Sequence, residues 1–210
     1  MKKLATISVP DRIMQRARAT GRGGVFTPSD FLDLASRAAV DQALSRLTRN
    51  GKLRRLARGL YDYPKAHPKL GLLSPAPDDV ARALARETGS QAQIAGAHAA
   101  NALGLSTQVP AKSLYLTNGP SRRIVLGKRV VDLRHASPKH LIAPGSPAGT
   151  VVQALRHVGP VRAGDVARVA ANRLSAKDQK VLASSASQAP AWMRPTLVSI
   201  GNAASELADG

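Results

Sequence analysis

Hydrophobic residues recur at spacings of three and four along the first fifty positions, which is the pattern of amphipathic helices. A first helix is expected to bury Ile13, Met14 and Ala17 along one face. Ser8 can cap its start and Gly21 can end it. The sequence GGVFT, residues 23–27, then offers a brief extended segment.

A second helix is predicted directly after this segment. Thr27 and Asp30 have the spacing of a capping box, and Pro28 suits the first helical position. The buried stripe of this helix is expected to consist of Phe31, Leu32 and Leu34.

A third helix is predicted from a cap at Ser36 to Asn50, where Gly51 ends it. Its apolar residues share one face and are expected to point inward; they are Val40, Ala43, Leu44 and Leu47. The opposite face is polar and carries Arg37, Asp41, Gln42, Ser45 and Arg49, with Arg46 at its margin.

Two short strand-like runs, Leu53–Leu56 and Leu60–Tyr63, follow the third helix. They flank a tip that contains Gly59, which can take the positive φ of a tight hairpin with a bulge. Three helices followed by a hairpin are typical of a winged helix-turn-helix domain, which we expect to span residues 1–64.

In such a domain the third helix enters the major groove of DNA, and the hairpin, called the wing, lies over the backbone or the minor groove. Guanidinium groups bind guanine or phosphate, and glutamine pairs with adenine. The candidate DNA-binding residues are therefore Arg37, Gln42, Ser45, Arg46, Arg49, Lys52, Arg54, Arg55 and Arg58. The alternative is a small helical interaction domain whose basic face is only solvated.

Prolines at 64, 68, 75 and 77 interrupt any helix in the next stretch, so residues 65–77 are predicted to be a linker. Residues 78–210 are expected to form a second, mixed domain. Strand-sized runs between residues 112 and 134 predict a small antiparallel sheet, and a strand passing into a helix that ends at Gly104 precedes it. Further helices are predicted near residues 138–142, 147–157, 163–172 and 176–187. The fold class is therefore expected to be α+β.

Basic residues gather on the strands of this second domain. They are Arg122, Arg123, Lys128, Arg129 and Arg134. Such residues can bind a partner, which would be an acidic protein or a second stretch of nucleic acid. Alternatively, they form a cationic sheet edge that prevents aggregation. The pattern leaves these interpretations open.

The composition narrows the class of function. The 210 residues carry 31 Lys and Arg against 13 Asp and Glu, a net charge of +18 that favours a polyanionic partner. The lack of cysteine excludes disulfides, thiolate metal sites and cysteine nucleophiles. Apart from six aromatic residues the apolar content is mostly Ala, Leu and Val, which favours a core of close-packed helices.

No enzyme class is indicated. The chain lacks a Walker loop, a nucleophile elbow and a zinc-binding helical histidine pair, and it has only two glutamates. We therefore expect no catalytic residue, no metal site and no cofactor. No run is long and apolar enough to span a bilayer, and Thr6, Ser8 and Pro10 interrupt any secretory segment after Met1. A soluble, cytoplasmic protein without membrane association is expected.

Two strings carry a resemblance to a known family. GKLRRLARGLYDYP (residues 51–64) and AQIAGAHAANALGLSTQVPAKSLYLTNGPSRRIVLGKRVVDLRHASP (residues 92–138) resemble the AbiEi-type antitoxins of bacterial abortive-infection toxin–antitoxin systems. The resemblance covers approximately residues 8–158. The second string is the more specific, because many regulators share a winged helix.

The resemblance implies a protein that binds operator DNA to repress its own operon and counteracts a nucleotidyltransferase-like toxin. It transfers DNA binding to the third helix, Arg37 to Arg49, and to the wing, Leu53 to Tyr63. It assigns no residue to toxin neutralisation. The alternative is a winged-helix transcriptional regulator whose second domain senses a ligand or mediates oligomerisation.

Overall fold

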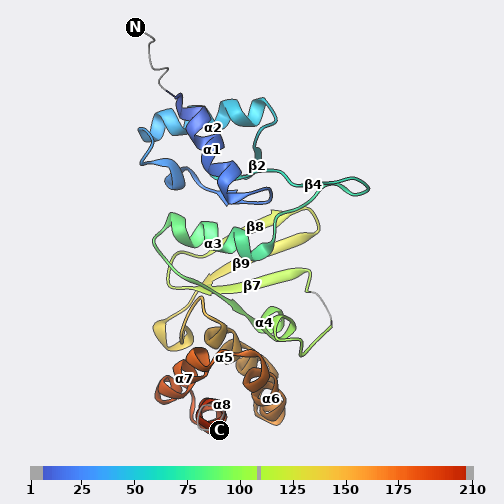
Figure 1. Ribbon diagram of the computed structural model, residues 1–210, viewed down its shortest axis with the longest axis vertical. Helices are drawn as coiled ribbons and strands as arrows, with labels where there is room; N and C mark the ends of the chain where they lie inside the picture. The colour runs from blue at the N-terminus through green and yellow to red at the C-terminus, as the bar shows by residue number, and fades with distance from the viewer. Residues whose placement is uncertain (1–6, 108–109, 207–210) are drawn as a thin grey trace. The chain divides into compact units, whose positions relative to one another are not determined.

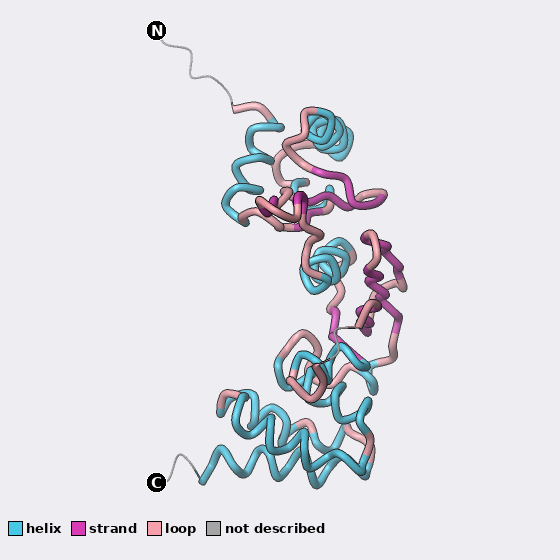
Figure 2. The backbone as a smooth tube through the Cα atoms, turned by 90° about the vertical axis from the view of Figure 1, so that its right-hand side faces the viewer, coloured by secondary structure: helices cyan, strands magenta, loops and turns pink. Residues whose placement is uncertain are grey.

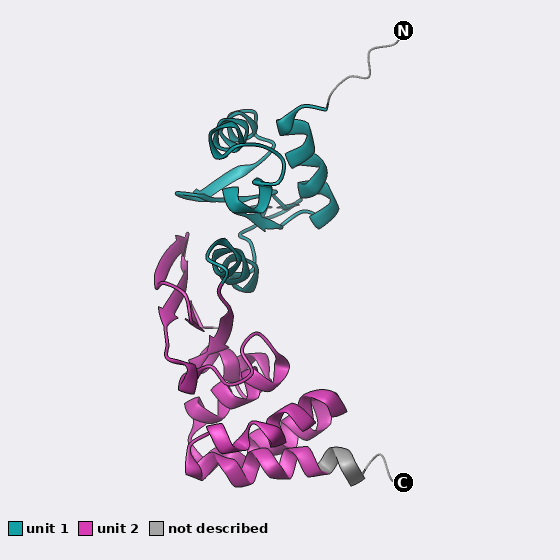
Figure 3. Cartoon of the chain, turned by 90° about the vertical axis from the view of Figure 1, so that its left-hand side faces the viewer, with its two compact units in different colours: residues 1–89 teal, residues 90–210 magenta. Residues whose placement is uncertain are grey.

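The computed structural model describes residues 7–107 and 110–206 of the chain. It divides into two compact units, residues 1–89 and 90–210 (Figure 3). Residues 1–6, on which the expectation of no secretory segment depends, lie outside the described residues, as do residues 108–109 of the second string above.

The first unit has the element order of a winged helix-turn-helix (Figure 1). The antiparallel strands pair in the order β1-β3-β2, so that the wing hairpin β2–β3 is joined to the strand that follows the first helix. The elements are α1 (Val9–Thr20), β1 (Val25–Phe26), the 3-10 turn η1 (Pro28–Phe31), α2 (Arg37–Arg49), β2 (Arg54–Ala57) and β3 (Leu60–Asp62).

The caps predicted for the first and third helices are confirmed. The Ser8 hydroxyl accepts from the backbone N–H of Asp11 at 3.4 Å, and the Ser36 hydroxyl accepts from that of Ala39 at 3.4 Å. Each bond satisfies one of the N–H groups that have no partner within the helix. Both helices therefore begin where the sequence indicates.

The predicted second helix is wrong, because the chain forms only the 3-10 turn η1 there. The capping box is present: the Asp30 carboxylate accepts from the backbone N–H of Thr27 at 2.8 Å. Leu32, however, is 46% exposed instead of buried. The next cap, Ser36, leaves too few positions for a stable α-helix, since nucleation is costly.

Apolar side chains from α1, α2 and η1 form the core of the first unit. Ile13, Phe31 and Leu44 are fully buried, and the rings of Phe26 and Phe31 lie 5.6 Å apart. The inward residues predicted for α2 are all buried: Val40, Ala43, Leu44 and Leu47. The opposite face of α2 is consequently fixed toward solvent.

The stretch expected to be a linker contains a short exposed hairpin, β4 (Ala66–His67) and β5 (Gly71–Leu72). The following helix, α3 (Pro77–Glu87), lies almost entirely in the range 78–210 that is expected to form the second domain, but it belongs to the first unit. The guanidinium of Arg86 donates to the Asp30 carboxylate at 3.1 Å and to the Val25 carbonyl at 3.2 Å. These bonds hold α3 to the turn and strand that precede α2.

The sheet of the second unit is mixed rather than antiparallel, which corrects the expectation. Its strand order is β6-β7-β9-β8, and the central pair β7–β9 is parallel. A hairpin joins β8 to β9, and β9 inserts beside β7, so that β8 lies at the edge. The strands are β6 (Ala92–Ala95), β7 (Lys112–Thr117), β8 (Arg122–Leu126) and β9 (Arg129–His135).

Helices make up the remainder of the second unit (Figure 2). The α-helices are α4 (Gly96–Ala102), α5 (Pro147–Val158), α6 (Ala163–Arg173), α7 (Ala176–Ser184) and α8 (Arg194–Glu206), and the 3-10 turns are η2 (Pro138–His140), η3 (Pro160–Arg162), η4 (Ala186–Gln188) and η5 (Ala191–Met193). Their core is built largely from Ala, Val and Leu, as expected, and the fold class α+β is confirmed. The sequence did not predict α8. None of the described helices combines the length and the hydropathy that a membrane crossing requires.

Candidate nucleic-acid interface

The solvent face of α2 carries the predicted recognition residues. All five, Arg37, Gln42, Ser45, Arg46 and Arg49, are exposed. The Arg37 guanidinium pairs with the Asp41 carboxylate one turn later at 3.0 Å, and the Arg49 guanidinium donates to the Ser45 hydroxyl at 3.4 Å. No side-chain hydrogen bond or ion pair engages Gln42 or Arg46 within the described part of the chain.

This face can therefore present an amide and guanidinium groups to base edges without first breaking a buried contact. The Arg37–Asp41 pair is exposed, so its separation costs little. The arrangement has the chemistry that direct readout in a major groove requires.

The wing also presents basic groups. Lys52, Arg55 and Arg58 are exposed, and Gly59 at the tip has φ +70°, as the predicted hairpin requires. The register shifts between Arg55 and Ala57, which is the predicted bulge. Three cations thus lie along a hairpin next to α2.

Arg54 differs from the other candidates, because its side chain is engaged within the protein. It forms a two-pronged ion pair with the carboxylate of Asp62, at 3.0 and 2.5 Å, and donates to the Leu73 carbonyl at 2.8 Å. The hydrogen bonds that Arg54 donates to the Asp62 carboxylate, together with the charge of that carboxylate, raise the pKa of the Arg54 guanidinium against the opposing effect of burial. Its predicted role as a phosphate contact is therefore not supported by its position, and we assign it to the stability of the wing.

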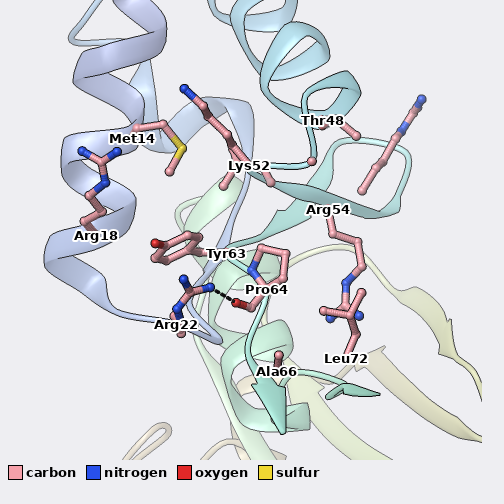
Figure 4. Close-up of a pocket in the computed structure, with 13 residues that line it drawn as sticks. Met14, Arg18, Arg22, Thr48, Lys52, Arg54, Tyr63, Pro64, Ala66 and Leu72 are labelled. Atoms are coloured by element: carbon pink, nitrogen blue, oxygen red, sulfur yellow. Dashed lines mark hydrogen bonds between the residues drawn. The ribbon is translucent and has the colours of Figure 1, made fainter. Parts of the chain in front are cut away.

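Two arginines that the sequence analysis did not select lie close to the wing. Arg18, in the last turn of α1, and Arg22, in the loop that follows this helix, line a groove together with Lys52 and Tyr63 (Figure 4). The Arg22 guanidinium stacks over the Tyr63 ring at 4.9 Å and donates to the Pro64 carbonyl at 2.9 Å. Only the folded chain brings α1 next to the hairpin, so spacing along the sequence gives no signal for this cluster.

The basic residues of the second unit do not form one patch. Directly opposite residues of an antiparallel pair point to the same face. Arg122 pairs with the buried Leu133 and Arg123 pairs with Asp132, so these two arginines lie on opposite faces of the sheet. The others are exposed at the hairpin turn and on β9: Lys128, Arg129 and Arg134.

Arg134 is already paired within the protein. The buried carboxylate of Asp132 accepts from Lys112 at 2.9 Å and from Arg134 at 3.0 Å. Burial acts to raise the pKa of Asp132, but the two hydrogen bonds outweigh it and hold the pKa below its usual value. The sheet is therefore a weaker candidate for anion binding than α2 and the wing.

No curated protein and no solved structure matches this chain. Residues 12–182, which include α2, the wing and most of the second unit, match a family of unknown function, DUF6088, and the chain belongs to that family.

Proposed function

We propose that this protein is a sequence-specific DNA-binding repressor of its own operon whose second unit opposes a nucleotidyltransferase-like toxin. The observation that carries the DNA-binding part is the exposed polar face of α2, with Gln42 and Arg46 unengaged among the described residues, beside a wing that carries Arg58 at its tip. A net charge of +18 favours the approach to a polyanion.

The residues divide into two roles on DNA. Gln42, Arg46 and Arg49 read base edges from α2, which gives sequence preference. Lys52 and Arg55 contact phosphates, which adds affinity without sequence preference.

The antitoxin part is supported by the resemblance of residues 8–158 to AbiEi-type antitoxins. The same resemblance supports autorepression of the operon. For the second unit we name no residue as a toxin contact.

DNA binding is tested with the full-length protein and a duplex from the promoter of its own operon, against a scrambled duplex. Gln42→Ala and Arg49→Ala are each expected to weaken promoter binding by about 1 to 3 kcal/mol and to reduce the preference over the scrambled duplex. Arg168→Ala on α6 is the matched control, because it removes one exposed arginine outside every candidate surface. Unchanged affinity and preference in both α2 variants would refute this recognition face.

The antitoxin role is tested by growth of a strain that expresses the toxin gene encoded beside this one. Full-length protein is expected to restore growth and to repress the promoter. Repression without rescue would refute the antitoxin role and favour a regulator whose second unit senses a ligand or mediates oligomerisation.

A further inference from the structure

A groove of about 700 Å³ lies in the first unit, at the end of the wing hairpin opposite to the Arg58 tip. Its walls are the second half of α1 and the loop after it, the turn between α2 and β2, and the β5 strand. It does not include the solvent face of α2. Lys52 and Arg55, which we proposed above as phosphate contacts, belong to its lining, whereas the proposed base contacts and the wing tip do not.

The lining of the groove is strongly cationic. It includes Arg18, Arg22 and Lys52, together with Arg54 and Arg55, and no acidic residue. Arg54 is neutralised by Asp62, but no carboxylate pairs with Arg18, Arg22 or Lys52 within the part of the chain that the structure describes. Close positive charges repel one another, so an anion between them would be stabilised.

The floor of the groove is held in place. Backbone hydrogen bonds join Tyr63 to the loop after α1, from Tyr63 N to Gly24 O at 2.9 Å and from Gly23 N to Tyr63 O at 2.7 Å. Figure 4 shows Arg18, Arg22 and Lys52 around the Tyr63 ring. Because Arg22 is already fixed by its stacking and its bond to Pro64, little ordering is needed to bind a ligand.

We propose that this groove is a binding site for phosphate groups, held by Arg18, Arg22 and Lys52, with the Tyr63 ring under an adjoining planar or apolar part of the ligand. Arginine donors fit phosphate oxygens as a fork, and lysine adds a point charge. The neutral polar side chains of the lining are those of Thr48 and Tyr63, so selectivity rests on charge and stacking rather than on reading a base edge. The phosphates belong either to a small ligand such as a nucleotide or to the backbone of bound DNA.

The first arm of the test uses the full-length protein with pyrophosphate, ADP and adenosine, and measures binding by calorimetry and by the shift of the melting temperature. Pyrophosphate and ADP are expected to bind, and adenosine much more weakly. The double variant Arg18→Gln/Arg22→Gln is expected to weaken ADP binding at least about tenfold, because it removes two charge-assisted contacts. Arg18→Lys/Arg22→Lys should retain most of the affinity, and Arg12→Gln, on the same helix but outside the lining, should change nothing.

The second arm measures how duplex binding depends on salt. If the phosphates are those of DNA, the Gln pair lowers the slope of log K against log salt by about 0.9 for each phosphate that is no longer neutralised, while pyrophosphate and ADP do not bind. The proposal is overturned if neither arm responds to the Gln pair, or if Arg12→Gln acts as strongly. If the double variant does not fold, Lys52→Gln, at an exposed position, replaces it in both the ADP-binding and the salt-dependence measurements. The small-ligand arm requires no DNA binding, so it separates this inference from the proposed function.

Discussion

Replacing Arg54 with alanine is expected to destabilise the first unit strongly, although Arg54 lies in a surface hairpin. Asp62 is fully buried, and both of its carboxylate oxygens accept from Arg54. The same guanidinium also satisfies the carbonyl of Leu73. The variant would remove all of these donors at once.

The magnitude follows from the burial of the remaining carboxylate. Breaking a buried ion pair by removing one partner costs about 3 to 5 kcal/mol. The Arg54 side chain is 28% exposed, so water can partly replace it, and we expect the lower end, about 3 kcal/mol. A domain is stabilised by only about 5 to 15 kcal/mol, so this is a large share of the total.

Urea unfolding of the full-length chain measures this effect, followed by circular dichroism. Fluorescence of Trp192, the single tryptophan, reports on the second unit and should keep its midpoint. Arg55→Ala is the matched control, because Arg55 is the next residue in the strand, is exposed and lacks an ion pair among the described residues; it should cost no more than about 0.5 kcal/mol. Arg54→Ala combined with Asp62→Asn should recover part of the loss, because the buried charge is removed.

The reasoning is refuted if Arg54→Ala costs no more than Arg55→Ala. A decrease in DNA affinity with unchanged stability would return Arg54 to the phosphate-binding residues. Urea unfolding and DNA binding, measured on both variants, distinguish these two results.

Three further changes test other parts of the fold. Gly201→Ala places a methyl group against Ala183 where α7 and α8 meet, and should lower the stability of the second unit by about 1 to 3 kcal/mol, seen in the Trp192 transition. Asp132→Asn should make the stability of the protein less dependent on pH in the acid range. The pKa of Asp132 in the folded protein lies below its value of about 3.9 in the unfolded chain. The ionised carboxylate therefore stabilises the fold above a pH of about 3.9, and this contribution is lost as the pH falls through the pKa of the folded state. Ser36→Ala removes the cap of α2 and should cost about 0.5 to 1 kcal/mol in urea unfolding.

Each of these expectations has an opposing outcome. An unchanged Trp192 midpoint in Gly201→Ala would mean that α7 and α8 separate without cost. Identical acid unfolding of Asp132→Asn and the unaltered chain would mean that the hydrogen bonds from Lys112 and Arg134 do not favour the ionised form. Unchanged stability on removing the Ser36 hydroxyl would mean that water caps α2 equally well.

Features fixed by neighbouring residues could be predicted from the sequence. Ser36 caps α2 because its hydroxyl reaches an N–H three residues later, and Gly59 forms the wing tip because a positive φ favours glycine. The inward stripe of α2 follows from helical periodicity. The exposure of the candidate recognition face could therefore be predicted as well.

Features fixed by contacts between distant parts of the chain could not be predicted from the sequence. The parallel pairing of β7 with β9 depends on how the β8–β9 hairpin folds back, which no local pattern encodes. In α8, Gly201 and the flanking Ser199 and Asn202 dilute the apolar stripe, although Leu197 and Ile200 are buried. The Arg54–Asp62 pair is intermediate, because the register of the predicted hairpin places two residues of opposite charge opposite each other.

The attachment of α3 to the first unit bears on how such genes can recombine. Exchange of the downstream half at the proline-rich stretch before residue 77 would leave Asp30 without the guanidinium of Arg86 and remove a helix that packs on η1. A junction after Gly89 would carry that helix along with the winged helix. New effector modules are therefore expected to be acquired at the later junction, and chimaeric proteins should be designed with the same crossover point.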